Sequence, residues 1–462
     1  AAVLDGVLLD LAPVVLDAPL ASVKAAQGLI ALSDSLHADT NLGADPLGAL
    51  LRDLPLAPDE AFAELVDLAR LASSAGVRAV VVDATAAHDL GASDAQELGW
   101  SIAAGVAYLR ALTSGGLSVV EAARLIEFRY AATDEQFPTI AKLRAARRLW
   151  ARVLSVSGAE GVPMRIHAAT SRPMLSKYDP YVNMLRGTVA AFAAGVGGAD
   201  SVTVLPFDSA LGVPEGFGRR IARNVNHLLI DESHVAVVAD PAGGSYAVER
   251  LTADLAASAW DVFTQLESEW EGGHDFEPFR DRVAEVAAVR AKDIARRKRP
   301  LTGLSEFPAL DESLPTRPVD PLNDRVVRYG AAYEALRDAP VASKVFLATL
   351  GPVAQHTARA TFATNLLAAG GIGVEIAGAT ASAEELVGKY RAAGSPAVVA
   401  LAGADKTYAE WGPDAVEALR EAGAHHVIIA GKPDAIDAVV DDAAYVGVDA
   451  LAFLTATREH LS

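Results

Sequence analysis

VRAVVVD (residues 77–83), followed by the helical periodicity of residues 93–113, sets the fold class of this chain. A continuous β-branched run of this length is typical of a strand covered on both faces. Further strand candidates are residues 163–167, 201–205 and 235–239, with helical segments at 139–153, 180–194 and 216–231. This alternation predicts βα units around a parallel sheet, and over about 250 residues we expect a (β/α)8 barrel.

The amino-acid composition changes at residues 299–340. This stretch is rich in proline and acidic residues, which predicts a linker. Strand candidates follow it at residues 344–350, 373–376, 397–401, 426–430 and 445–448. Helical stretches alternate with them at 357–369, 383–393, 414–422, 435–441 and 450–460. Such βα repeats predict a small doubly wound domain of flavodoxin-like type. The expected organisation is therefore a barrel over residues 1–298, a linker over 299–340 and a flavodoxin-like domain over 341–462.

Composition excludes several classes of protein. The formal net charge is -19, from 40 Lys+Arg against 59 Asp+Glu, and no basic run interleaved with aromatic residues offsets it, so nucleic acid is not an expected partner. Cysteine is absent, which removes disulfides, thiolate metal sites and cysteine nucleophiles. No apolar run reaches the roughly 20 residues that span a bilayer, so we expect a cytoplasmic protein without a membrane segment. Residues 6–18 (GVLLDLAPVVLDA) predict a buried strand, so we expect the chain to begin inside a domain.

Five segments, in order along the chain, resemble the barrel of the methylmalonyl-CoA mutase family. They are HDLGASDAQELGWSIAAGVAYLRAL (88–112), IAKLRAARRLW (140–150), YDPYVNMLRGTVAAFAAGVGGADS (178–201), RRIARNVNHLLIDES (219–233) and DPAGGSYAVE (240–249). The resemblance implies a barrel that binds acyl-CoA along its axis and a C-terminal domain of the type that holds a corrinoid. It also implies adenosylcobalamin as the cofactor, which supplies the radical chemistry that interconverts methylmalonyl-CoA and succinyl-CoA.

The corrinoid motif of this family, Asp-x-His-x-x-Gly, is broken in this chain. The corresponding loop reads GPVAQHTAR (351–359), where His356 is present but Ala354 replaces the Asp and Arg359 replaces the Gly. In the intact motif the His binds cobalt, the Asp orients the His, and the Gly leaves room for the cofactor. We interpret His356 as a helix-start or interface histidine and expect no cofactor or metal site on this chain. His88, which precedes Gly91 with the same spacing, has Ala86 in place of the Asp and is interpreted as structural.

The catalytic position in the barrel has also changed. The family carries a catalytic His in a segment resembling Gln-Ser-Leu-His-Thr-Asn, and Thr203 stands at that position here. A threonine hydroxyl can donate a hydrogen bond but does not act as an acid near neutral pH. Arg165 matches the arginine that binds the substrate carboxylate, although its surroundings (ATSRPM, 169–174) depart from the family's Gln-Thr-Ser-Gly-Trp-Ser. Arg165 therefore either binds the substrate carboxylate or has lost that role and pairs with acidic residues of this chain.

These departures predict a non-catalytic small subunit that stabilises a homologous catalytic subunit in a heterodimer. Adenosylcobalamin and turnover then belong to the complex, with the cofactor on the partner subunit. Two alternatives stay open: an active acyl-CoA mutase with atypical corrinoid binding, or a CoA-binding regulatory or chaperone-like protein. Retention of a corrinoid by the isolated chain discriminates the first alternative, and acyl-CoA binding without a partner discriminates the second.

Overall fold

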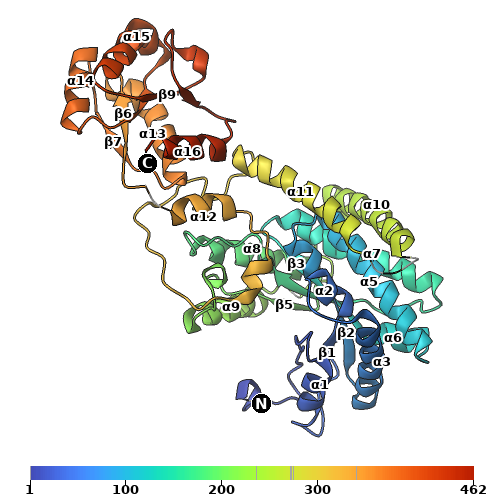
Figure 1. The fold of residues 1–462 in the computed structure, drawn as a ribbon. Coiled ribbons are helices and arrows are strands. Elements are labelled where there is room, and N and C mark those ends of the chain that lie inside the picture. The colour runs from blue at the N-terminus through green and yellow to red at the C-terminus, as the bar shows by residue number, and fades with distance from the viewer. Residues whose placement is uncertain (1, 236, 271–272, 274, 340, 462) are drawn as a thin grey trace. The chain divides into compact units, whose positions relative to one another are not determined.

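The computed structural model describes residues 2–235, 237–270, 273, 275–339 and 341–461, which fall into two compact units. The N-terminal unit comprises the described residues up to Leu175, together with Asn183–Ala287 and Arg317–Arg328. The C-terminal unit comprises Ser176–Val182, Ala288–Thr316 and the described residues from Tyr329 onward. Both units are built of helices and parallel strands, which confirms the predicted α/β class (Figure 1).

Among its described residues, the N-terminal unit has one parallel sheet in the order β1-β2-β3-β4-β5. The strands are β1 (Asn41–Ala44), β2 (Arg78–Asp83), β3 (Ile126–Ala132), β4 (Arg165–Thr170) and β5 (Ser201–Thr203). The helices are α1 (Ser22–Ile30), α2 (Pro46–Leu51), α3 (Pro58–Ala75), α4 (Thr85–Asp89), α5 (Asp94–Ser114), α6 (Val119–Leu125), α7 (Gln136–Val156), α8 (Val182–Val196), α9 (Gly216–His227), α10 (Tyr246–Glu269) and the first part of α11 (Glu277–Ala295). Each strand from β1 to β4 leads through a helical connection to its parallel neighbour, as right-handed βα units require.

The two faces of β3 show how this sheet separates a polar side from a core. Phe128 and Tyr130 are fully buried against the helices, with the Phe128 ring 4.8 Å from that of Trp150 on α7. The Tyr130 hydroxyl lies 2.7 Å from that of Ser101 on α5. Because side chains alternate along a strand, Glu127 and Arg129 lie on the opposite face. That face is where the cavity of this unit lies.

The C-terminal unit contains a second parallel sheet in the order β10-β9-β8-β6-β7, which is 2-1-3-4-5 when its strands are numbered along the chain. The strands are β6 (Val345–Thr349), β7 (Val374–Ile376), β8 (Val398–Ala402), β9 (His426–Ala430) and β10 (Asp442–Ala444). The helices are α12 (Ala331–Asp338), α13 (Val353–Ala369), α14 (Ala383–Ala392), α15 (Asp405–Glu421) and α16 (Ala450–Glu459). Helices therefore alternate with strands along almost the whole unit.

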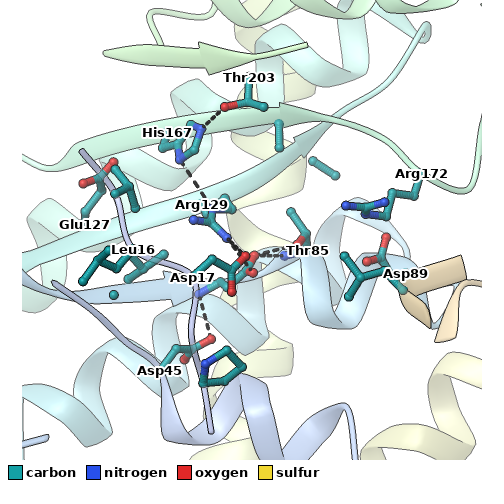
Figure 2. Close-up of a pocket in the computed structure, with 18 of the residues that line it drawn as sticks. Leu16, Asp17, Asp45, Thr85, Asp89, Glu127, Arg129, His167, Arg172 and Thr203 are labelled. Atoms are coloured by element: carbon teal, nitrogen blue, oxygen red, sulfur yellow. Dashed lines mark hydrogen bonds and ion pairs between the residues drawn. The ribbon is translucent and has the colours of Figure 1, made fainter. Parts of the chain in front are cut away.

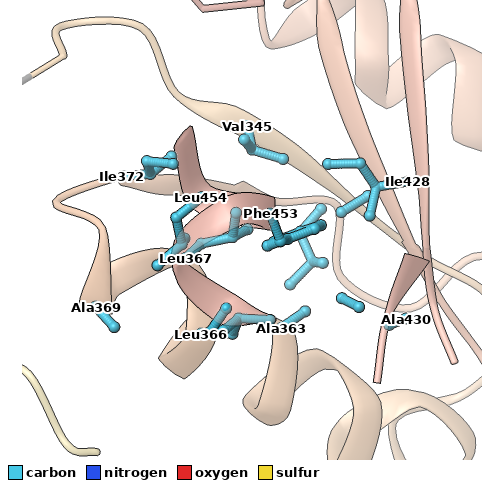
Figure 3. Close-up of a cluster of buried hydrophobic side chains, with 14 of the residues drawn as sticks. Val345, Ala363, Leu366, Leu367, Ala369, Ile372, Ile428, Ala430, Phe453 and Leu454 are labelled. Atoms are coloured by element: carbon cyan, nitrogen blue, oxygen red, sulfur yellow. The ribbon is translucent and has the colours of Figure 1, made fainter. Parts of the chain in front are cut away.

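Alternate residues of each central strand of this second sheet build two separate cores. Val345, Leu347 and Ile428 pack with α13 and α16, as Figure 3 shows for Leu367 and Phe453. Phe346 and Val399, one position along, pack with residues of α14 and α15 on the other face. A strand buried on both faces must be apolar at every position, which is why these strands appear as continuous apolar runs in the sequence.

Several local predictions were wrong. Residues 6–18 form turns and irregular chain with Leu8 and Leu11 exposed, and one backbone bridge, between Val15 and Asn41, joins this segment to β1. β1 and β3 were missed, because polar Asn41, Glu127 and Arg129 interrupt their apolar patterns. The expected strand at 235–239 is absent at 237–239, where the chain bends, and residue 236 lies outside the described residues.

Two predictions in the C-terminal unit were also wrong. The expected helix at 435–441 is replaced by one 3-10 turn (Pro433–Ala435) and irregular chain. The last strand is Asp442–Ala444 and not 445–448. Asp441 accounts for part of this shift, because its carboxylate accepts a 2.6 Å hydrogen bond from the Val427 backbone N–H and so ties this segment to β9.

Candidate functional site

A cavity of about 760 Å³ lies in the N-terminal unit, on the face of the sheet opposite the helices. Its wall is formed by inward-facing residues of neighbouring strands, among them Glu127 and Arg129 of β3, Arg165 and His167 of β4, and Thr203 of β5. Figure 2 shows these strands crossing the cavity, with the N-terminal segment that carries Leu16 and Asp17 running along it. This segment is held to β1 because the Leu16 N–H donates to the Asn41 carbonyl at 2.9 Å. Charged side chains from distant parts of the chain therefore share one enclosed space.

An ion-pair network joins the carboxyl end of β2 to the middle of β3. The buried Asp83 carboxylate lies 2.9 Å from the Arg52 guanidinium and 3.1 Å from that of Arg129, and Asp17 lies 3.5 Å from Arg129. Burial by itself would raise the pKa of Asp83, but the two guanidinium groups outweigh it and hold that pKa well below its usual range. Because Arg52 and Arg129 are both paired with Asp83, neither is a free anion-binding group.

Two further carboxyl groups on the cavity wall have raised pKa values. Burial, reinforced by the nearby Asp83 charge, raises the pKa of Asp45 to about 7. Burial likewise raises the pKa of Asp89 to about 6, against the opposing effects of His88, Arg52 and Arg172. Since the cavity holds acids and bases in similar number, its charge is nearly balanced and it is not a strong anion trap.

The raised pKa of Asp89 predicts a specific pH dependence of stability. An acid whose pKa is higher in the folded state holds its proton more tightly there, so its contribution to stability is lost as the pH rises from about 4 to about 6. We expect Asp89→Asn, which cannot ionise, to be more stable than the wild type at pH 7.5 by about 2–3 kcal/mol, and to lose most of that advantage at pH 4. Thermal unfolding of both proteins at the two pH values measures this difference.

Asp261→Asn serves as the control for this comparison, because the Asp261 side chain is exposed on α10. It removes the same charge from the surface of α10, so its stability relative to the wild type should be the same at both pH values. An equal advantage of Asp89→Asn at pH 4 and pH 7.5 would contradict the assignment of the raised pKa to Asp89.

His167 is joined to Thr203 and Arg129 by a polarised chain of hydrogen bonds. The Arg129 Nε–H donates to His167 Nδ1 at 3.4 Å, so the neutral imidazole carries its proton on Nε2 and donates it to Thr203 Oγ1 at 2.8 Å. Burial and the neighbouring Arg129 charge lower the pKa of His167 to about 4, which keeps the ring neutral near pH 7. The Thr203 hydroxyl proton therefore stays available to donate to a ligand acceptor in the cavity.

Arg165 lies at the first position of β4, where acidic residues surround it. Its guanidinium is 3.1 Å from the Asp39 carboxylate and 3.9 Å from that of Asp200. Arg165 lines the cavity together with Thr203, so the structure brings these two predicted positions into one space. His167, two residues after Arg165, was missed by the sequence interpretation, although side chains two apart on a strand share a face.

His356 and Arg359 lie in the C-terminal unit on α13, which starts just after β6. His356 is buried and its Nδ1–H donates to the Gly351 carbonyl at 3.1 Å, and the ring also lines a groove of about 430 Å³ along α13. Arg359 crosses the carboxyl edge of the sheet: it donates to the Gly403 carbonyl at 2.6 Å, pairs with Asp405 at 2.5 Å, and lies over the Tyr408 ring. The guanidinium also lies close to Gly431, because a methyl group added to that glycine would be 3.7 Å from the guanidinium carbon of Arg359.

These contacts test whether the corrinoid implied by the sequence resemblance fits. Ligands of doubly wound sheets bind beyond the carboxyl ends of the strands where the strand order reverses, which in this unit is between β6 and β8. Arg359 lies at that edge, where Gly403 and Asp405 hold its guanidinium. The residues present do not fit a corrinoid tail. Within the described residues, no group of three or more His, Asp or Glu side chains is arranged to hold a metal ion.

Beside the cavity lies a buried polar network that the sequence did not predict. Glu97 on α5 and Lys142 on α7 are both fully buried and form an ion pair at 2.7 Å, and Asp94 lies 2.9 Å from Lys142. His88 on α4 lies 3.6 Å from Glu97 through Nδ1 and 2.7 Å from the Ser171 hydroxyl through Nε2. Ser171 directly follows β4 and lines the cavity. The network thus runs from the core to the cavity wall.

Comparison with known proteins identifies the class to which this fold and cavity belong. A sequence profile of the methylmalonyl-CoA mutase family matches residues 7–394, and the chain therefore belongs to this family. The chain is 47% identical to the methylmalonyl-CoA mutase small subunit of Streptomyces virginiae, across 99% of this chain and 77% of that protein. It is 37% identical to the methylmalonyl-CoA mutase small subunit of Propionibacterium freudenreichii subsp. shermanii, across 99% of this chain and 76% of that protein.

A third relative is the probable methylmalonyl-CoA mutase small subunit of Mycobacterium tuberculosis strain H37Rv, which is 48% identical across 94% of this chain and 73% of that protein. All three relatives are longer than the segments that match.

No helix within the described part of the chain is both long enough and apolar enough to cross a membrane.

Proposed function

We propose that this chain is the non-catalytic small subunit of an adenosylcobalamin-dependent methylmalonyl-CoA mutase. In this proposal it forms a heterodimer with a homologous catalytic subunit in the cytoplasm. The complex interconverts methylmalonyl-CoA and succinyl-CoA, with the corrinoid on the partner. The small subunit stabilises the catalytic one by binding its folded state.

The observation that carries the proposal is Arg359. It stands where the family's corrinoid motif has glycine, and its guanidinium is fixed by Gly403, Asp405 and the Tyr408 ring at the edge where a cofactor tail would need to approach the backbone. Ala354, at the position of the motif's Asp, offers His356 no carboxylate. The Gly351 carbonyl instead accepts a hydrogen bond from Nδ1 of His356. His356 is therefore assigned a structural role at the start of α13.

The second support comes from the cavity of the N-terminal unit. Thr203 replaces the family's catalytic His, and its partner His167 is neutral near pH 7. The Thr203 hydroxyl can donate a hydrogen bond to a thioester carbonyl, but neither residue acts as an acid toward it. Arg165, the one substrate-binding candidate that we propose, is held by Asp39 and Asp200 and would need to leave them to bind a carboxylate.

We also propose the boundaries and the fold type of each domain. We assign residues 1–298 to an acyl-CoA-mutase-type (β/α)8 barrel, 299–340 to a linker, and 341–462 to a flavodoxin-like domain of cobalamin-binding type. The parallel order β1 to β5 and the cavity on its inner face support the first assignment. The strand order 2-1-3-4-5 supports the last.

The direct test is corrinoid retention by the purified chain. Adenosylcobalamin is added to the chain alone and to the chain co-expressed with a methylmalonyl-CoA mutase catalytic subunit, and absorbance spectra are taken after desalting. We expect the chain alone to retain none and the complex to retain about one equivalent per heterodimer, because only the partner has an open site. Retention by the chain alone favours an active mutase with atypical binding and overturns the proposal. Failure to co-purify with the catalytic subunit, combined with acyl-CoA binding by the chain alone, favours the CoA-binding alternative.

A further inference from the structure

We propose that Ser171 is an acyl-accepting nucleophile, activated by His88, and that the chain hydrolyses small activated acyl esters or thioesters in the cavity of the N-terminal unit. This activity is independent of the small-subunit function proposed above. It needs neither a corrinoid nor a partner.

The hydrogen bond between His88 and Ser171 is short, and we assign the serine hydroxyl as its donor. Glu97 Oε2 lies 3.6 Å from His88 Nδ1, so an imidazole proton on Nδ1 faces this carboxylate and leaves the Nε2 lone pair for the Ser171 hydroxyl at 2.7 Å. The Met174 N–H donates to Ser171 Oγ at 3.3 Å and occupies one acceptor position of that oxygen, and the hydroxyl proton remains available for His88. This is the arrangement of a serine nucleophile with a general base.

Glu97 lies next to His88 and is itself held in place. Glu97 is fixed on three sides: it accepts from Lys142 Nζ at 2.7 Å through Oε2 and from the Ala131 N–H at 2.7 Å through Oε1, and it faces His88. His88 and Glu97 are 4% and 0% exposed, so the carboxylate acts on the imidazole without competition from water. With Glu97 facing the base at 3.6 Å, the three side chains stand in the order of a serine–histidine–acid arrangement, which is recognised by geometry and not by sequence position.

The position of Ser171 in the fold suits a nucleophile. It directly follows β4, at the carboxyl end of the sheet, which is the side where parallel βα folds hold their active sites. Ser171 lines the cavity but is only 2% exposed, so the site suits a small acyl group. The backbone N–H of the next residue, Arg172, has no acceptor in the described part of the chain, and Arg172 also lines the cavity. An N–H directly after the nucleophile is a common oxyanion donor.

The chemistry balances with water as the only co-reactant. Ser171 Oγ attacks the acyl carbonyl carbon, its proton moves to His88 Nε2, and the bond from that carbon to sulfur or oxygen breaks as the leaving group takes the proton from His88. Water then attacks the acyl-serine and gives a proton to His88. Ser171 Oγ leaves as the carboxylic acid forms and takes that proton back.

The test uses a fluorophosphonate, which reacts with activated serines, and the full-length chain. Intact mass and peptide mapping should show one adduct per chain, on Ser171. The adduct should be absent in Ser171→Ala, formed at least about 100-fold more slowly in His88→Gln, and unchanged in Ser201→Ala, which replaces a serine that lines the same cavity on β5. A matching burst of p-nitrophenol from p-nitrophenyl acetate, about one equivalent per chain, measures acylation.

Circular dichroism shows whether each variant folds, and the wild-type result decides the proposal even if His88→Gln does not fold. A wild type without an adduct overturns it, as does an adduct on another serine. Reaction of folded His88→Gln at the wild-type rate would show that His88 does not activate Ser171. None of these results bears on corrinoid retention, so the small-subunit proposal stands or falls separately.

Discussion

Lys142→Met is expected to lower the free energy of unfolding of the N-terminal unit by about 3–5 kcal/mol, because it leaves Glu97 as an uncompensated charge in the core. Both side chains are fully buried and lie 2.7 Å apart. Burial alone would lower the pKa of Lys142, but the carboxylates of Asp94 and Glu97 outweigh it and raise that pKa above its ordinary value. The measurement is a thermal or urea unfolding curve followed by tryptophan fluorescence, since Trp100 and Trp150 are buried in this unit.

A double variant separates loss of the ion pair from loss of packing. Glu97→Gln combined with Lys142→Met removes both charges, and the glutamine oxygen can still accept from the Ala131 N–H. We expect it to recover most of the stability lost in Lys142→Met. Arg250→Met, which breaks the exposed pair with Asp254, should give no measurable change. If Lys142→Met unfolds like the wild type, Glu97 is not held as a buried charge.

The second large effect is expected from restoring the corrinoid motif. Ala354→Asp with Arg359→Gly recreates Asp-x-His-x-x-Gly around His356, removes the guanidinium from the carboxyl edge of the sheet, and supplies a carboxylate near the histidine. We expect the double variant to bind hydroxocobalamin at least about tenfold more tightly than the wild type, which corresponds to about 1.4 kcal/mol. Spectrophotometric titration of the purified chain measures the difference.

The single variants distinguish the two causes in this experiment. Ala354→Asp alone keeps Arg359 and its partners in place, so it should bind no better than the wild type. Arg391→Gly makes the same replacement on α14, away from this edge, and controls for loss of an arginine from a helix. A double variant that binds no more tightly than the wild type would show that Arg359 is not what closes the site.

The changed motifs of the candidate site could be found from the sequence, but the contacts of their residues could not. The broken motif at residues 351–359 and Thr203 were found from the sequence because a motif is a local pattern with fixed spacing. The contacts that Arg359 makes could not be found from the sequence, because Gly403, Asp405 and Tyr408 come from a different βα unit. Similarly, Arg165 was singled out, but its two acidic partners could be identified only from the tertiary structure, because Asp39 precedes β1 and Asp200 precedes β5.

The sequence by itself determined the α/β class, most of the strands of both sheets and several helix starts, because these depend on local periodicity and capping. Ser93 and Gln96, for example, form a capping box at the start of α5. Only the tertiary structure decided which charged and polar groups meet. Glu97 and Lys142 are 45 positions apart, and His88 and Ser171 are 83 apart. An ion pair or a nucleophile–base pair depends on distances of a few ångströms, and those distances are set by how the helices pack on the sheet.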